Sequence, residues 1–227
     1  MKIEATQGSF SEVRVKICCI SSIEEAKDAI SFGAAAVGLV AEMPSGPGPI
    51  SDELIRAIVR TIPPPIASFL LTSRTDTTAI IKHQQSVHSN VIQIVDALQT
   101  GSYEDFRRQI PAIKIVQVIH VIDEKTVDEA LEMAEHVDAL LLDSGNPNLS
   151  VKELGGTGRV HNWAISRAIV EQSKVPVFLA GGLKAENVRA AIETVQPYGL
   201  DLCSSVRTNG KLDLFKLEDF FNEIYKI

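Results

Sequence analysis

Two side chains that could transfer protons stand at the ends of apolar segments in this sequence. Cys18 closes a run in which basic and apolar residues alternate, and Asp143 follows four consecutive apolar residues. A thiol acts as a base only in its thiolate form, and a carboxyl group can serve as a general acid. The pair therefore indicates acid–base catalysis. The plainer alternatives are that Cys18 is a small core side chain and that Asp143 caps the following helix.

The alternation around Cys18 predicts which side chains share its surroundings. In a strand, successive side chains point to opposite faces, so Val15, Ile17 and Cys19 should share one face. Lys16 and Cys18 should share the other. A neighbouring ammonium group would favour the thiolate form of Cys18.

A second group of residues could bind phosphate. Gly181 and Gly182 follow the apolar segment "VFLA", Ser204 and Ser205 follow "LDLC", and the stretch "LGGTGR" covers Leu154–Arg159. Small residues allow the close backbone approach that phosphate oxygens need. The alternatives are that the double glycine only makes a tight turn and that "GGTG" is only a flexible loop.

These residues need elements that bring their strand ends together. Apolar, β-branched runs recur between segments with helical periodicity, in which Ser22 and Ser51 are candidate N-caps and Gly33 a terminator. The connection 96–109 shows the weakest helical pattern. Repeated βα units predict a parallel sheet, and eight of them predict a closed α/β barrel of the (β/α)8 (TIM) type, with an open doubly wound sheet as the alternative. The predicted strands are Val13–Ile20, Ala36–Ala41, Ile66–Leu71, Val91–Val95, Ile113–Val121, Ala139–Asp143, Pro176–Ala180 and Leu200–Val206.

No composition shift divides the chain, so we expect one barrel domain over residues 13–227 after an N-terminal extension of residues 1–12. In such a barrel the active site lies at the C-terminal ends of the strands. Cys18, Asp143, Gly181 and Ser204 would all lie there. His120 could also face this mouth, although a single histidine is more often structural.

Composition excludes several classes of function. The 227 residues are 45% hydrophobic, which is enough for a sizeable core, and the net charge is −7. An acidic chain of this kind is a poor match for nucleic acid, and no apolar run reaches the roughly 20 residues that span a bilayer. The start of the sequence lacks the apolar core of a signal peptide. We therefore expect a soluble, cytoplasmic protein without nucleic-acid or membrane partners.

The three cysteines, Cys18, Cys19 and Cys203, have neither zinc-type spacing nor the number that a disulfide framework requires. We predict that all three are reduced. Cys19 and Cys203 are best explained as small core side chains.

Several motifs, in order along the chain, resemble phosphoribosylanthranilate isomerase, the (β/α)8 enzyme of tryptophan (aromatic amino acid) biosynthesis. They are "KICCIS", "LLLDSG", "GGTGRVHNW", "PVFLAGGLKAENVRAAI" and "PYGLDLCSSVR". The resemblance implies an Amadori rearrangement, in which an aminoaldose phosphate becomes an aminoketose phosphate without cofactor or metal. The partner it implies is a small phosphorylated sugar amine. Members of the family occur as monomers or dimers, so a homodimer is compatible with it.

The resemblance also implies residue roles. Cys18 would be the general base that removes the C2 proton, and Asp143 the general acid that protonates the ring oxygen. Gly181, Gly182, Ser204 and Ser205 would hold the phosphate. Gly156 and Thr157 would cap that site.

Some positions depart from the family's pattern. The glycine that follows the base is Cys19, and Cys203 replaces a serine. In the second loop, Gly48 or a neighbouring proline stands where an arginine is expected to meet the anthranilate carboxylate, and Val95 replaces a histidine. Arg159 and Arg207 are candidates for the missing cation. The loss favours, as an alternative, a paralogue that rearranges another phosphoribosyl-amine. A non-catalytic barrel that binds a sugar phosphate is a further alternative, although it would need neither Cys18 nor Asp143.

Overall fold

The computed structural model describes residues 13–146, 149, 154 and 158–226. Strands and helices alternate along the chain, as the apolar and amphipathic runs predict. The strands of the main sheet are β1 (Arg14–Ile17), β2 (Ala36–Val40), β3 (Ala67–Thr72), β4 (Val91–Ile94), β5 (Lys114–His120), β6 (Ala139–Asp143), β7 (Val177–Leu179) and β8 (Gly199–Leu202). The helices are α1 (Ile23–Ser31), α2 (Asp52–Val59), α3 (Thr77–Val87), α4 (Tyr103–Gln109), α5 (Lys125–Met133), α6 (Trp163–Gln172), α7 (Val188–Val195) and α8 (Leu214–Tyr225). The last connection adds the 3₁₀ turn η2 (Ser204–Val206) and the short strands β9 (Arg207–Thr208) and β10 (Lys211–Leu212).

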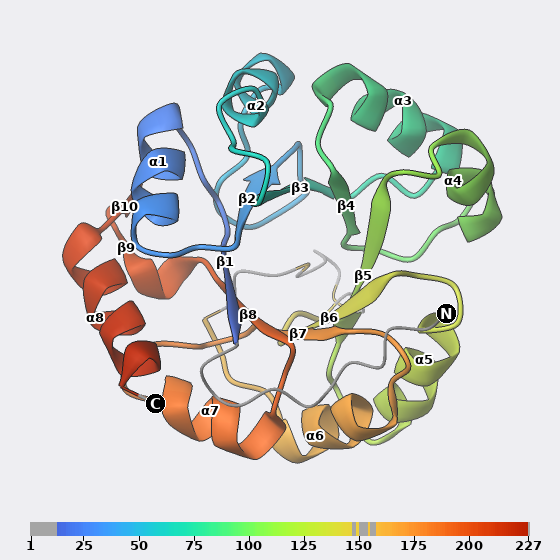
Figure 1. The fold of residues 1–227 in the computed structure, drawn as a ribbon. Coiled ribbons are helices and arrows are strands. Elements are labelled where there is room, and N and C mark those ends of the chain that lie inside the picture. The colour runs from blue at the N-terminus through green and yellow to red at the C-terminus, as the bar shows by residue number, and fades with distance from the viewer. Residues whose placement is uncertain (1–12, 147–148, 150–153, 155–157, 227) are drawn as a thin grey trace.

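The strands close into a barrel in the order β1 to β8, with all neighbours parallel and β8 paired back to β1. The helices surround this barrel as an outer ring (Figure 1). The predicted (β/α)8 barrel is therefore confirmed, and the open doubly wound sheet is not. The connection with the weakest helical pattern does contain a helix, α4, whose N-cap Ser102 and Asp105 form a capping box.

Local capping residues begin the first helices where the sequence predicts. The side chain of Ser22 accepts a hydrogen bond from the amide of Glu25, and Ser51 does the same for Leu54. These bonds satisfy amides that lack a partner inside the helix. Gly33 follows the end of α1 with a φ of 110°, a conformation that a glycine adopts without strain.

Side chains of the strands alternate between two apolar layers. Val15 and Ile17 point outward into the large core between sheet and helices, whereas Cys18 belongs to a smaller cluster inside the barrel. Lys16 is fully buried beside this inner cluster, with its ammonium 5.2 Å from the ring centre of Phe69. The predicted division of β1 is thus confirmed for these four residues.

Cys19 does not join the outward face as predicted. It lies beyond the last residue of β1 with a φ of 61°, and this left-handed turn breaks the alternation. Its side chain packs in the inner cluster with Cys18. Cys18 and Cys19 therefore reach the same end of the barrel.

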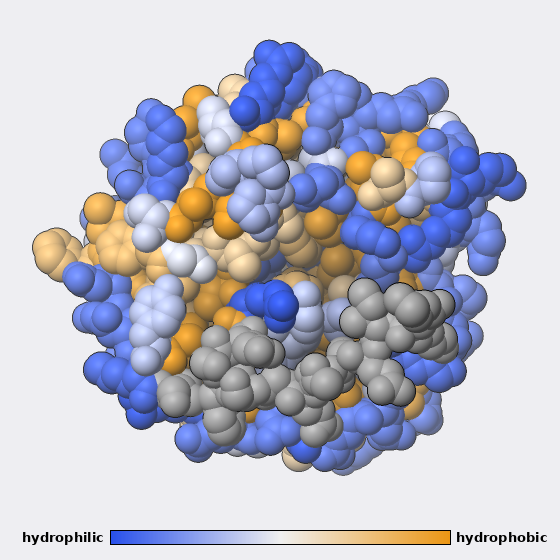
Figure 2. All heavy atoms as spheres, in the orientation of Figure 1, coloured by the Kyte–Doolittle hydropathy of each residue, from blue (hydrophilic) through white to orange (hydrophobic). Residues whose placement is uncertain are grey.

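In a view along the barrel axis, hydrophilic residues dominate the periphery of the surface, and hydrophobic residues gather toward the centre (Figure 2). Within the described ranges, none of the helices is long and apolar enough to cross a membrane. The described residues form one barrel with its helices, and the predicted extension 1–12 lies outside them.

Candidate active site

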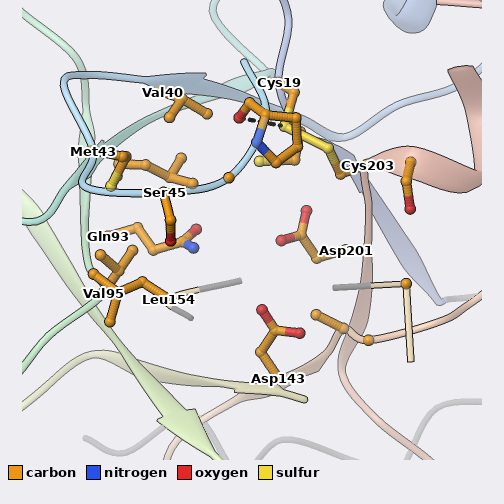
Figure 3. A pocket seen from close by; sticks show the side chains of 18 of the residues that line it. Cys19, Val40, Met43, Ser45, Gln93, Val95, Asp143, Leu154, Asp201 and Cys203 are labelled. Carbon is orange, nitrogen blue, oxygen red and sulfur yellow. Dashed lines mark hydrogen bonds between the residues drawn. A yellow bond between two sulfur atoms is a disulfide. The ribbon is translucent and has the colours of Figure 1, made fainter. Parts of the chain in front are cut away.

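A pocket opens at the C-terminal ends of the strands, with about 680 Å³ of empty space including the part open to solvent. Side chains from strand ends on opposite sides of the barrel project into it (Figure 3). The lining residues are Cys18, Cys19, Val40, Met43, Ser45, Gly46, Pro47, Leu71, Gln93, Val95, Asp143, Leu154, Gly158, Ala180, Gly181, Gly182, Asp201, Cys203 and Ser204.

The two candidate acid–base residues both line this pocket. Cys18, from the end of β1, is 5% exposed, and Asp143, the last residue of β6, is 7% exposed. The carboxylate of Asp143 accepts a hydrogen bond of 2.7 Å from the amide of Ser144. The expected placement of a thiol and a carboxyl group at one mouth agrees with this geometry.

A buried ion pair lies directly beside Cys18. Lys16 is register partner to Asp201 on β8, and its ammonium donates to that carboxylate at 2.8 Å. Burial alone would lower the pKa of Lys16, but the charge of Asp201 and the neighbouring Cys18 raise it. Lys16 therefore remains a cation inside the barrel.

The electrostatics of Cys18 differ in part from the expectation. Burial raises the pKa of the Cys18 thiol to about 11, the Lys16 ammonium lowers it, and Asp201 opposes Lys16 by raising it. Lys16 thus favours the thiolate as predicted, but burial has the larger effect. Burial also raises the pKa of Asp201, and Lys16 offsets this only in part.

The glycines after β7 have steric reasons to be glycine. Gly181 and Gly182 have φ values of 80° and 63°, where other residues are strained. A Cβ at Gly182 would lie 2.7 Å from the backbone carbon of Arg159, and one at Gly181 would lie 3.1 Å from its oxygen. Both line the pocket, so the steric explanation applies without excluding a role toward phosphate.

Of the other residues predicted to bind phosphate, Ser204 lines the pocket and Ser205 does not. Ser204 lines the pocket, and Gly158 from the loop after β6 lies opposite, since a Cβ there would be 3.7 Å from the Ser204 hydroxyl. Ser205 sits in η2 outside the pocket lining, and Gly156 and Thr157 lie outside the described residues.

The prediction that all three cysteines are reduced is wrong. Cys19 and Cys203 form a disulfide with a Cα–Cα distance of 5.9 Å, and Cys18 is the free thiol among the three. The two bridged residues are 184 positions apart, but barrel closure sets β1 beside β8 and brings them into contact. Sequence spacing conceals a contact of this kind.

The candidate cation Arg207 is engaged elsewhere. Its guanidinium forms an ion pair of 2.8 Å with Glu25 and donates to the carbonyl oxygens of Gly210 and Cys19. Because it is absent from the pocket lining and held by α1, we do not assign it to substrate. Arg159 is exposed and is likewise absent from the lining.

Two ion pairs and a disulfide thus connect side chains near the place where β1 pairs with β8. We call this group of residues the β1–β8 seam. Its members are Lys16, Cys19, Glu25, Asp201, Cys203 and Arg207.

The loop after β2 explains two departures from the family's pattern at once. Gly48 has a φ of 89°, and a Cβ there would lie 2.7 Å from the Cβ of Cys19. The side chain of Cys19 therefore occupies space that any larger residue at position 48 would need. Position 19, where the resemblance predicts glycine, and Gly48, one of the residues that stand in place of the arginine, are therefore sterically coupled.

The pocket side formed by β2, β3 and β4 is called the β2–β4 wall here and comprises Val40, Met43, Leu71, Gln93 and Val95. The described lining of the whole pocket contains neither lysine nor arginine.

Two pocket residues escaped sequence reasoning. Asp201 and Gln93 both stand inside strands rather than at strand ends, so strand-end position could not identify them. The apolar residues that flank Asp201 in "GLDL" are the signal that could have identified it, because a lone charge in an apolar strand needs a partner such as Lys16. His120 is absent from the lining, and its ring nitrogen Nε2 lies 3.2 Å from the carbonyl oxygen of Val95, which fits the structural explanation.

Across the described ranges, no group of three or more His, Cys, Asp or Glu residues could hold a metal ion. The closed parallel barrel defines the molecule as a TIM-barrel protein, and its C-terminal mouth carries a thiol and a carboxyl group.

The comparisons with known proteins agree on one family. The family model for N-(5'-phosphoribosyl)anthranilate (PRA) isomerase matches residues 15–223. The N-(5'-phosphoribosyl)anthranilate isomerase of Methanosarcina acetivorans is 35% identical over 94% of this chain and 93% of its own length. N-(5'-phosphoribosyl)anthranilate isomerase 2 of Methanosarcina mazei is 36% identical over 95% and 97%.

Solved structures are similar as well. The phosphoribosyl anthranilate isomerase of Thermotoga maritima superimposes with a TM-score of 0.79 at 29% identity, covering 95% of this chain and all of that one. A phosphoribosyl anthranilate isomerase in complex with reduced 1-(o-carboxyphenylamino)-1-deoxyribulose 5-phosphate gives a TM-score of 0.76 at 27% identity. The chain belongs to the N-(5'-phosphoribosyl)anthranilate isomerase family and is an enzyme of the isomerase class.

Proposed function

We propose that this chain converts N-(5'-phosphoribosyl)anthranilate into the corresponding 1-deoxyribulose 5-phosphate, with Cys18 as general base and Asp143 as general acid. The observation that carries the proposal is the convergence of Cys18 from β1 and Asp143 from β6 on one pocket, together with Gly181 and Ser204. The family relationship supplies the substrate and the reaction.

The chemistry suits these residues. Asp143 donates a proton to the ring oxygen, the furanose opens, and a Schiff base forms between C1 and the amine nitrogen. The Cys18 thiolate then removes the C2 proton to give the enolamine, which gains a proton at C1 as the ketose forms. Positioned general acids and bases each contribute typically 10²–10⁴-fold to the rate.

The phosphate would be held by backbone amides of the loops after β7 and β8, near Gly181, Gly182 and Ser204. Ser205 and the undescribed Gly156 and Thr157 would complete this site. Such loops are a common phosphate site in barrels of this type.

The test is an isomerase assay with N-(5'-phosphoribosyl)anthranilate on the wild type and on Cys18→Ala and Asp143→Ala. We expect turnover by the wild type and a loss of roughly 10²–10⁴-fold in kcat in each variant. Unchanged turnover in either variant would remove that residue from its role.

One observation favours a second candidate function. With Gly48, the β2 loop lacks the arginine that the resemblance predicts for the anthranilate carboxylate. A paralogue that acts on another phosphoribosyl-amine would not need this arginine. No turnover of phosphoribosylanthranilate, with binding of inorganic phosphate retained, would support this paralogue or a non-catalytic barrel.

A further inference from the structure

The Cys19–Cys203 disulfide joins two parts of the pocket that have different roles in the proposed reaction. Cys19 follows the proposed base Cys18, and Cys203 comes directly before Ser204, whose loop is proposed to hold phosphate. Both bridged residues line the pocket, and the bond between their sulfur atoms borders it (Figure 3). The resemblance predicts glycine at position 19 and serine at position 203, so the family's pattern does not account for this bridge.

The connection that carries Ser204 is held near both of its ends. At its far end, Arg207 forms an ion pair with Glu25 and donates to the carbonyl oxygen of Cys19. At its near end, Cys203 is the first residue after β8, and the disulfide ties it to the turn after β1. Breaking the disulfide would leave the Arg207 contacts in place and release the end beside Ser204. The loop would then be less well ordered before a phosphate binds, which weakens binding.

The proposed base is positioned by a different kind of bond. The amide of Cys18 donates to the carbonyl oxygen of Leu202 at 2.7 Å, which extends the pairing of β1 with β8 by one residue. This hydrogen bond does not involve the disulfide. Opening the bridge should therefore change the binding of phosphate more than it changes the position of Cys18.

The disulfide can be reached by a reductant from the pocket. Cys203 lines the pocket and is partly exposed, whereas Cys19 is 4% exposed, so a dithiol would attack the sulfur of Cys203 and displace that of Cys19. The second sulfur of the dithiol would then displace Cys203. Two electrons and two protons pass to the bridge, which becomes two thiols, and the dithiol becomes a disulfide. The sulfur of Cys19 lies 3.6 Å from the carbonyl oxygen of Pro47, which is an acceptor for its thiol in the reduced form.

We propose that the Cys19–Cys203 bridge is a redox-sensitive site, in which the disulfide form binds the phosphate of the substrate more tightly than the dithiol form does. Reduction raises KM and leaves kcat nearly unchanged. This inference rests on the phosphate site of the proposed function. Because linkage between two equilibria is reciprocal, phosphate must in turn stabilise the disulfide against reduction by the same factor.

The test compares the disulfide form of the wild type, the wild type reduced with dithiothreitol, and Cys203→Ser. Binding of inorganic phosphate is measured by calorimetry, and KM and kcat are measured with N-(5'-phosphoribosyl)anthranilate, at a temperature where circular dichroism shows all three to be folded. We expect reduction to raise the phosphate Kd and the KM by roughly 3- to 10-fold and to change kcat by less than about twofold. Cys203→Ser should give the values of the reduced wild type with or without dithiothreitol.

A second measurement uses the reciprocal effect. At equilibrium with mixtures of reduced and oxidised dithiothreitol, saturating phosphate should raise the ratio of disulfide to dithiol protein by the same factor of roughly 3- to 10-fold. Trapping the thiols with a maleimide measures this ratio. A disulfide with a purely structural role would lower the thermal midpoint on reduction without this effect of phosphate.

Equal phosphate affinity of the two forms would overturn the inference, and so would a bridge that dithiothreitol opens only after denaturation. Turnover with a KM that does not respond to reduction would overturn this inference and leave the proposed function standing. Phosphate binding that responds to reduction, without any turnover, would instead overturn the proposed function and leave this inference standing.

Discussion

The two sides of the pocket are built differently. The β1–β8 seam holds its side chains through a buried ion pair, a disulfide and an Arg207–Glu25 pair. The β2–β4 wall is apolar except for Gln93. Strand pairing positions the seam, whereas the loop after β2 contributes Ser45, Gly46 and Pro47 to the pocket lining.

The departures from the family's pattern do not fall equally on the two sides. Cys18 lies on the side of the seam, where the Lys16–Asp201 ion pair and the Cys19–Cys203 disulfide connect β1 to β8. The resemblance predicts an arginine in the second loop, where Gly48 or a neighbouring proline stands, and a histidine at position 95, and both are absent. Under the proposed function, the acid–base pair is kept, and the residues that would meet the substrate's other end depart from the family's pattern.

The largest effect on stability is expected from breaking the ion pair of the seam. Lys16→Met should lower the free energy of unfolding by about 3–5 kcal/mol, because it leaves Asp201 buried without its partner. Arg14→Met is the matched control on the same strand, since the Arg14 guanidinium stacks 4.5 Å over the Tyr198 ring on the exposed face. We expect less than about 1 kcal/mol for that control. Urea denaturation measures both, and equal losses would mean that the buried pair has no special weight.

Reduction of the disulfide should have the next largest effect. Because the Cys19–Cys203 bridge closes a segment of 184 residues, a reducing agent should lower the free energy of unfolding by about 2–4 kcal/mol. Thiol titration of the denatured chain should find one free thiol before reduction and three after it. Cys203→Ser should show the lower stability in both buffers. A wild type whose thermal unfolding does not respond to reduction would contradict the bridge.

The link between the two sides can be tested at Gly48. Gly48→Arg should lower the free energy of unfolding by about 1–3 kcal/mol, because its Cβ collides with Cys19 and its φ is unfavourable. Adding Cys19→Gly should recover part of this loss, since it removes the side chain in the way. Losses that simply add would show that the two positions are independent.

The smallest expected effect is a change in the pH dependence of Cys18. In a Cys19→Gly/Cys203→Ser background, the rate of Cys18 alkylation by iodoacetamide should rise with pH toward an inflection near the pKa of about 11, because the thiolate is the reactive form. Asp201→Asn removes a charge that raises this pKa, so the inflection should move to lower pH. An inflection that moves to higher pH would contradict the assigned effect of Asp201.

Much of the fold is readable from local patterns. Apolar runs with β-branched residues predict the position of each strand to within a few residues. The N-caps Ser22 and Ser51 are predicted because a serine followed by acidic residues is a local signal of a helix start. Strand-end position also identified Cys18 and Asp143 as pocket residues, because the carboxyl ends of parallel strands meet at one mouth.

The remaining features depend on contacts between distant segments. The Cys19–Cys203 bridge and the Arg207–Glu25 pair arise only because closure sets β8 against β1. The pKa of the Cys18 thiol likewise depends on burial, Lys16 and Asp201 together. The alternation of residues along β1 predicts only that Lys16 is near. The lack of a hydrogen-bond partner for Oε1 of Gln93 among the described residues also depends on the side chains that neighbouring strands set beside it, such as Leu71 on β3.

The proposed pairing of base and acid is tested most directly by following the reaction in heavy water. The wild type should convert N-(5'-phosphoribosyl)anthranilate into a ketose that carries one deuterium at C1. Cys18→Ala should form this product at a rate lower by roughly 10²–10⁴-fold. Deuterated product formed by Cys18→Ala at the wild-type rate would show that another group removes the C2 proton.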